Sequence, residues 1–118
     1  MDRRQIGMDA ENRAADFLVA AGLTVLRRNY RCRLGELDIV ARHGPLLVIA
    51  EVRCRSRDDF GGAAASVTSA KQRRIVQATR HLLMRHPPLA QLSIRFDVLT
   101  VSADQTRVNW LRGAFTAG

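Results

Sequence analysis

The chain has 118 residues, and its 19 Lys and Arg outnumber 11 Asp and Glu, giving a net charge of +8. This length fits one domain spanning residues 1–118, and 47% apolar residues exclude a disordered tail. The longest apolar run, residues 46–50, is too short to cross a membrane, and no apolar segment of a secretory signal follows the first residues. Cys32 and Cys54 have neither metal-ligand nor disulfide-framework spacing. We expect a cytoplasmic protein with reduced thiols and no membrane partner.

The excess of basic residues points to a polyanionic partner, because neutralised phosphates release their counterions. However, 18 of the 19 basic residues are Arg, and Lys71 is the single Lys. Such a ratio also arises from GC-rich codon usage. Charge therefore favours nucleic acid as the partner, and a site is needed to support it.

The first half of the chain predicts one helix and three strands. Apolar residues recur at helical spacing over residues 9–21, and Gly22 is suited to end that helix. Residues 24–31, 35–42 and 46–55 are typical of strands. The short turn at residues 43–45 predicts that the last two of these strands form an antiparallel hairpin.

The second half predicts a loop, a helix and two strands. Residues 56–66 contain Asp, Gly and Ala, as expected for a flexible loop. A helix is expected over about residues 68–85, and Pro87 and Pro88 are suited to end it. Strands are expected over 93–101 and 107–111. The order α-β-β-β-α-β-β fits an α/β fold with one mixed central sheet flanked by helices.

Two acidic residues stand at unusual places in the predicted hairpin. Asp38 lies six residues before Gly44 and Glu51 seven residues after it, so pairing brings the two carboxylates together at one end. Two carboxylates about 5 Å apart repel by about 3 kcal/mol at an effective dielectric of 20. A shared proton or a cation offsets that repulsion, and without His or Cys ligands a hard ion such as Mg²⁺ or Mn²⁺ is favoured.

Glu11 is a third candidate, because it lies on the inward side of the first predicted helix. The alternative is that each acid pairs with a nearby Arg: Glu51 with Arg53, and Glu36 or Asp38 with Arg33 or Arg53. The sequence leaves both interpretations open.

Six short motifs follow one another across most of the chain. They are Gly7-x-x-x-Glu11, Asn29-Tyr30-Arg31, Gly35-Glu36-Leu37-Asp38, Glu51-Val52-Arg53, Lys71-Gln72 and Arg95-Phe96-Asp97-Val98. Together they resemble the YraN-type bacterial family, an uncharacterised group related to the PD-(D/E)xK nuclease superfamily. The resemblance implies a restriction-endonuclease-like fold with an α-β-β-β-α-β core, in agreement with the order predicted above.

The resemblance also implies a function, the hydrolysis of a nucleic-acid phosphodiester with Mg²⁺ or Mn²⁺, with DNA expected before RNA. It assigns metal binding to Asp38, Glu51, the carbonyl of Val52 and Glu11. The metal would activate a bound water and neutralise charge on the reacting phosphate. A resolvase-like activity on branched or damaged DNA is an analogy from the fold alone.

The sequence departs from the superfamily at Arg53, where a Lys is expected. Arginine keeps its proton and cannot act as a general base, although it can clamp a phosphate. Lys71, at the start of the second helix, is the only candidate to replace that Lys, and Gln72 beside it would orient a water or a ligand carboxylate. Alternatively, both residues face solvent or a DNA phosphate. Asp97, on a late strand between apolar neighbours, is expected to be structural.

Three functions remain open: a metal-dependent endonuclease, a nucleic-acid-binding module that lost catalysis with its Lys, and an interaction protein. In the third, residues 60–66 order on binding or exchange between the chains of a homodimer. For the first two, the residues expected to contact nucleic acid are Arg31, Arg33, Arg55, Lys71, Arg73 and Arg74.

Overall fold

The computed structural model describes residues 3–55 and 67–118, and the predicted loop 56–66 lies outside the described residues. Its elements are α1 Arg3–Ala20, β1 Thr24–Cys32, β2 Gly35–His43, β3 Leu46–Arg55, α3 Ser69–Arg85, the 3-10 helix η1 Pro87–Gln91, β4 Ser93–Ser102 and β5 Val108–Phe115.

The strands form one mixed sheet in the order β1-β2-β3-β4-β5. The β2–β3 hairpin is antiparallel, as predicted, whereas β3 and β4 run parallel and α3 connects them. The remaining neighbours, β1–β2 and β4–β5, are antiparallel. This mixed α/β arrangement confirms the predicted fold class and is consistent with a restriction-endonuclease-like core.

Two predicted boundaries were wrong. The first helix begins at Arg3 rather than at residue 9. Its start was missed because residues 5–8 are exposed and show no apolar stripe. The last strand continues to Phe115 rather than ending at residue 111. A register shift between Phe96 and Val98 and the positive φ of Gly113 interrupt the alternation that would reveal its full length.

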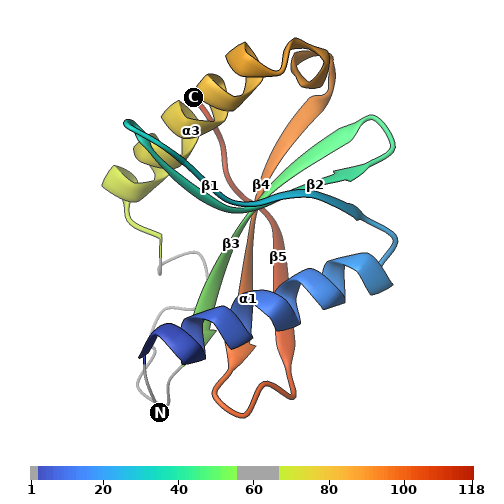
Figure 1. Cartoon of the computed structure of the whole chain (residues 1–118), viewed down its shortest axis with the longest axis vertical. Helices are drawn as coiled ribbons and strands as arrows, with labels where there is room; N and C mark the ends of the chain where they lie inside the picture. Colours follow the sequence, from blue (N-terminus) through green and yellow to red (C-terminus); the bar gives the residue numbers. More distant parts are fainter. Residues whose placement is uncertain (1–2, 56–66) are drawn as a thin grey trace.

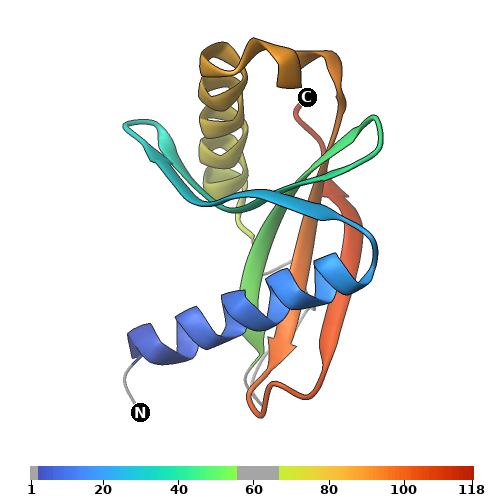
Figure 2. The ribbon, with the colours of Figure 1, turned by 45° about the vertical axis from the view of Figure 1, so that its right-hand side comes forward.

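The two helices pack on different faces of the sheet, as Figures 1 and 2 show. Leu47 and Ile49 of β3 belong to a cluster with buried residues of α3. Their neighbours Val48 and Ala50 belong to a second cluster with α1. Because successive strand side chains face opposite ways, β3 is buried on both sides, and this explains its continuous apolar run.

A close backbone approach joins the β1–β2 hairpin to α3. A Cβ atom added at Gly35 would stand 2.8 Å from the carbonyl oxygen of Arg74. Any larger residue there would push the hairpin away from the helix, so glycine allows the first turns of α3 to lie against the start of β2.

Asp97 is fully buried and organises the β4–β5 edge. Its carboxylate accepts hydrogen bonds from Arg95 (both 2.9 Å), from the indole Nε1 of Trp110 (2.8 Å) and from the backbone N–H of Gly113 (2.9 Å). Every contact is internal to the sheet, which confirms the expected structural role of Asp97.

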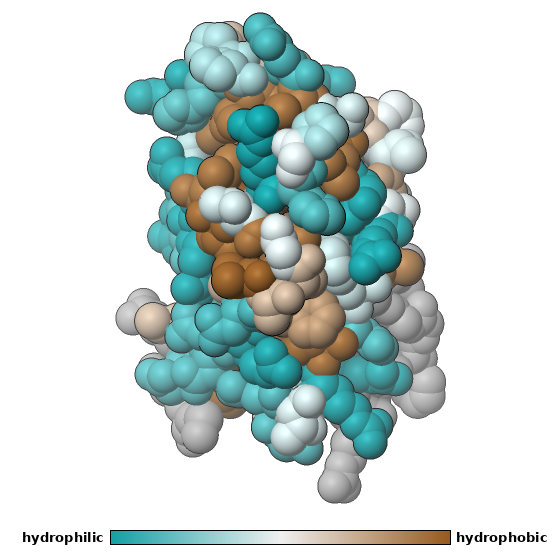
Figure 3. Space-filling view, turned by 90° about the vertical axis from the view of Figure 1, so that its right-hand side faces the viewer, coloured by the Kyte–Doolittle hydropathy of each residue, from teal (hydrophilic) through white to brown (hydrophobic). Residues whose placement is uncertain are grey.

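One side of the molecule has apolar surface in its middle, bordered by hydrophilic residues (Figure 3). The homodimer considered from the sequence stays a prediction.

In the described part of the chain, the helices are all too short or too polar to span a membrane.

Asp97→Asn should lower the free energy of unfolding by about 2–4 kcal/mol, because the positive charge of Arg95 loses its buried partner. Thermal denaturation should show a Tm lower by about 10 °C. Asp16→Asn, at an exposed position of α1, is the control and should leave the Tm close to that of the wild type. Equal Tm values for both variants would contradict the assignment.

Candidate functional site

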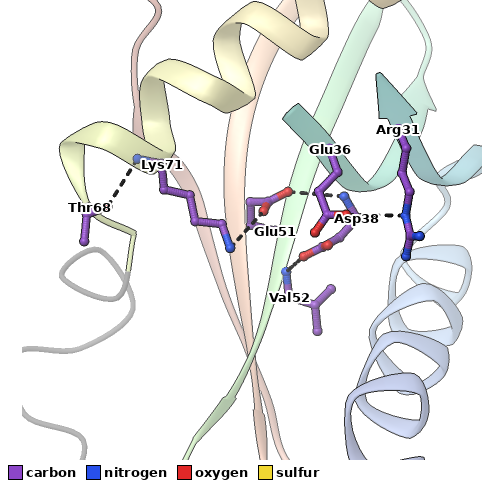
Figure 4. Close-up of polar contacts among 7 residues, drawn as sticks. All are labelled: Arg31, Glu36, Asp38, Glu51, Val52, Thr68 and Lys71. Atoms are coloured by element: carbon purple, nitrogen blue, oxygen red, sulfur yellow. Dashed lines mark hydrogen bonds and ion pairs between the residues drawn. The ribbon is translucent and has the colours of Figure 1, made fainter. Parts of the chain in front are cut away.

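The carboxylates of Asp38 and Glu51 meet where the pairing of β2 with β3 ends. Ile39 pairs with Ala50, and the two acids come one residue beyond that pair. The backbone N–H of Asp38 donates to Oε2 of Glu51 (3.3 Å), and the N–H of Val52 donates to Oδ2 of Asp38 (2.9 Å; Figure 4). The predicted proximity of the two acids is therefore confirmed.

Burial makes this carboxylate pair unusual. Glu51 is only 1% exposed, because it continues the strand face on which Leu47 and Ile49 pack against α3. Desolvation, and secondly the charge of Asp38, raise the pKa of Glu51 to about 8. Desolvation also raises the pKa of Asp38, although the hydrogen bond from Val52 opposes the shift. A nearby positive charge would therefore stabilise the ionised form of this pair.

Lys71 supplies the nearest positive charge from the first turn of α3. Its Nζ lies 4.0 Å from Oε1 of Glu51, and its side chain points toward that carboxylate (Figure 4). Thr68 caps the helix by accepting a hydrogen bond from the backbone N–H of Lys71 (3.2 Å). The cap fixes where the helix begins and so directs Lys71 toward the sheet.

Gln72 and Arg53, the other two residues predicted for this chemistry, have different surroundings. The side-chain amide of Gln72 donates to the carbonyl of Val67 (3.0 Å), so it braces the start of α3. Arg53 follows Glu51 by two residues, and its positive charge lowers the pKa of both carboxyls. The Nε of Arg53 is buried and has no hydrogen-bond partner among residues 3–55 and 67–118.

Glu11 approaches the pair from α1, and its side chain is 16% exposed. Its Oε1 lies 3.9 Å from Arg28 and is buried, with no hydrogen bond from the described part of the chain. Burial and then the charge of Asp38 raise the pKa of Glu11, so the carboxyl of Glu11 lies close enough to feel the charge of Asp38. Glu11 nevertheless stays apart, since within residues 3–55 and 67–118 no three His, Cys, Asp or Glu form a group suited to a metal.

The donor set at this site consists of oxygen atoms. The carboxylates of Asp38 and Glu51 are ligands of the hard type, and Mg²⁺ is commonly bound through one or two carboxylates plus waters and phosphates. The raised pKa values of Asp38 and Glu51 mark a position where a cation would relieve repulsion. The residues present therefore fit a hard divalent ion.

The predicted basic residues fall into separate groups. Arg31, Lys71 and Arg74 line one cavity between the β1–β2 hairpin and α3. Arg73 lines another groove, on the side of α3 near the C-terminal residues. Arg55 lines a cavity beside α1, and Arg33 is exposed in the turn after β1. Of the first group, Lys71 reaches the carboxylate pair, with its Nζ 4.0 Å from Oε1 of Glu51.

Sequence reasoning missed two residues that shape this site. Thr68 precedes a predicted helix, and its capping role was recognisable from residue type and position. The pairing of Arg28 with Glu11 had no local signal, because it joins β1 to α1 across the fold.

The fold is a mixed α/β arrangement that is consistent with a restriction-endonuclease-like core. A family model described as Uncharacterised protein family UPF0102 matches residues 10–101. The chain is 41% identical over 112 residues to the UPF0102 protein of Legionella pneumophila, covering 95% of each chain. It is 46% identical over 110 residues to one from Nitrosomonas europaea, covering 92% of each. The chain belongs to the UPF0102 family, which confirms the predicted membership of the YraN-type group.

The free energy of unfolding should fall as pH rises from 4.5 to 8 in EDTA. The folded chain holds a proton on Glu51 that the unfolded chain releases, since the pKa of this group is raised from 4.5 to about 8. The slope contributed is up to about 1.4 kcal/mol per pH unit. Glu51→Gln should remove it, so this variant gains stability over the wild type toward alkaline pH.

Chemical denaturation at a series of pH values measures this slope. Glu36→Gln, which alters an exposed carboxylate of the same hairpin, should keep the wild-type slope. If Glu51→Gln and the wild type lose stability in parallel between pH 4.5 and 8, the buried proton is not on Glu51.

Proposed function

We propose that this protein binds nucleic acid and hydrolyses a phosphodiester bond with the help of a divalent metal ion. The observation that carries the proposal is the buried pair of Asp38 and Glu51 with Lys71 at 4.0 Å. A structural ion pair needs only one acid for one Lys. Desolvation opposes the ionisation of both carboxylates together, and a bound cation would stabilise the doubly ionised pair.

Asp38, Glu51 and the carbonyl of Val52 would hold Mg²⁺ or Mn²⁺, and Glu11 would add negative charge from α1. When bound, the ion lowers the pKa of a water and neutralises charge on the phosphate. The hydrogen bonds from the backbone N–H groups of Val52 and Asp38 hold the carboxylates in fixed orientations, so little reorganisation is needed on binding.

Lys71 is the residue we assign to proton transfer. In the reaction the attacking water gives up a proton as its oxygen bonds to phosphorus, the bond to the leaving sugar oxygen breaks, and that oxygen takes up a proton. A lysine amine can exchange a proton in such a site, whereas the guanidinium of Arg53 cannot. Arg53 instead suits a clamp on the reacting phosphate, and its buried Nε has no partner within the described chain.

The net charge of +8 supports nucleic acid as the substrate class. Arg31, Lys71 and Arg74 line one cavity, and Lys71 and Arg53 carry the positive charges that act on the carboxylate pair. Phosphates on either side of the reacting one would find positive charge there.

A second candidate function is nucleic-acid binding without catalysis. Arg53 in place of the superfamily Lys favours it. This alternative gives binding that weakens steeply with salt and no cleavage stimulated by metal.

The purified protein should cleave labelled DNA in Mn²⁺ or Mg²⁺ and not in EDTA. Asp38→Asn and Glu51→Gln should each lower the cleavage rate by about 100-fold or more, because each removes a charge that would hold the ion. Asp16→Asn, an exposed carboxylate distant from the pair, should cleave at the wild-type rate. Activity that survives in Glu51→Gln would contradict the site, and salt-sensitive binding with no cleavage would favour the second function.

Lys71→Met should lower the cleavage rate by about 100-fold while changing DNA affinity much less, because it removes the proton-exchanging group. Adding Arg53→Lys to this variant should restore part of the rate, since a Lys then stands at the superfamily position. In the wild-type background, Arg53→Lys alone should not raise the rate. Full activity of Lys71→Met would exclude the assigned role.

A further inference from the structure

A cavity of about 350 Å³ lies between the end of the β1–β2 hairpin and the first turns of α3. Its volume is near the lower end of the range of ligand sites, about 300–1,000 Å³. The hairpin contributes Arg31 and Cys32, and the helix contributes Lys71, Arg74 and Ile75.

The lining of this cavity combines two chemistries. Arg31, Lys71 and Arg74 place positive charge around it, and the carboxylate of Glu36, which also lines the cavity, lies 3.4 Å from Arg31. Cys32 and Ile75 supply an apolar surface that belongs to the core cluster beneath α3. A ligand with an anionic group and a flat, weakly polar body matches this combination, and a nucleotide has both parts.

The hairpin and the helix are the two walls of this cavity. Gly35 lies against the backbone of Arg74, so the hairpin and the helix touch at that point. A space of this volume, bounded by two backbone elements, accommodates one nucleotide, whereas a base pair with its two backbones is too large.

Lys71 connects the cavity to the carboxylate pair, because it lines the cavity and also lies 4.0 Å from Glu51. A nucleotide in the cavity would therefore adjoin a phosphate held at Asp38 and Glu51. Resting on the proposed function, we infer that the cavity receives a single unpaired nucleotide beside the phosphate that is cleaved. Moving a base out of a duplex costs a few kcal/mol, and the cost is smallest where the base is already unpaired.

The inference is tested by fluorescence anisotropy in EDTA, with a labelled duplex and the same duplex carrying a single-nucleotide bulge. The wild type should bind the bulged DNA about tenfold more tightly, because no base pair has to open. Cys32→Trp fills the cavity and Arg74→Glu reverses a charge at its edge, so each should reduce the ratio to about two. Arg80→Glu makes the same charge change farther along α3, outside this cavity, and should keep the wild-type ratio.

Equal affinities of the wild type for the two DNAs would overturn the inference, as would a preference that both cavity variants retain. Arg74→Glu changes an exposed side chain, so it tests the cavity even if Cys32→Trp fails to fold. Cleavage in Mn²⁺ is measured in parallel. Cleavage with equal affinities would contradict the nucleotide cavity alone, whereas a bulge preference without cleavage would contradict the nuclease alone.

Discussion

Two carboxylates held side by side out of water are the constraint on which the rest of this structure depends. At an effective dielectric of 20, charges about 5 Å apart repel by about 3 kcal/mol, and desolvation adds to that cost. Backbone N–H groups of Asp38 and Val52 and the ammonium of Lys71 offset only part of it. The raised pKa values of Asp38 and Glu51 express the remainder. Such a pair costs stability, so its presence argues for chemistry rather than for folding.

The strands and the helix around the pair are arranged so that the two carboxylates stay together. The register of β2 against β3 sets which residues stand opposite one another, and a slip by one residue would turn Glu51 to the other face of the sheet. The cap at Thr68 determines where α3 starts, and Gly35 lets the helix approach the hairpin. The site therefore depends on backbone features that carry no catalytic group themselves.

The sequence contained enough information to predict the hairpin, the pair and most element boundaries. Counting outward from Gly44 was sufficient for Asp38 and Glu51, because strand pairing is local and its geometry is regular. Counting residues along the strands could predict neither the direction of the Gln72 side chain nor the partner of Glu11. Both depend on how a helix packs against a distant segment, which neither spacing nor residue type encodes. The cavity beside Lys71 is likewise a product of the packing of α3 on the hairpin.

The single Lys of an arginine-rich chain gives the composition a sharper meaning. Compositional drift toward Arg affects all exposed positions alike, since Arg and Lys are nearly equivalent as solvated charges. They differ where a proton must leave or where a compact charge must fit, and there only Lys serves. Lys71 lies 4.0 Å from the buried Glu51, whereas the residue two positions after Glu51 is Arg53. If proton transfer at this site uses a side-chain amine, Lys71 has to provide it, because the chain holds no other lysine.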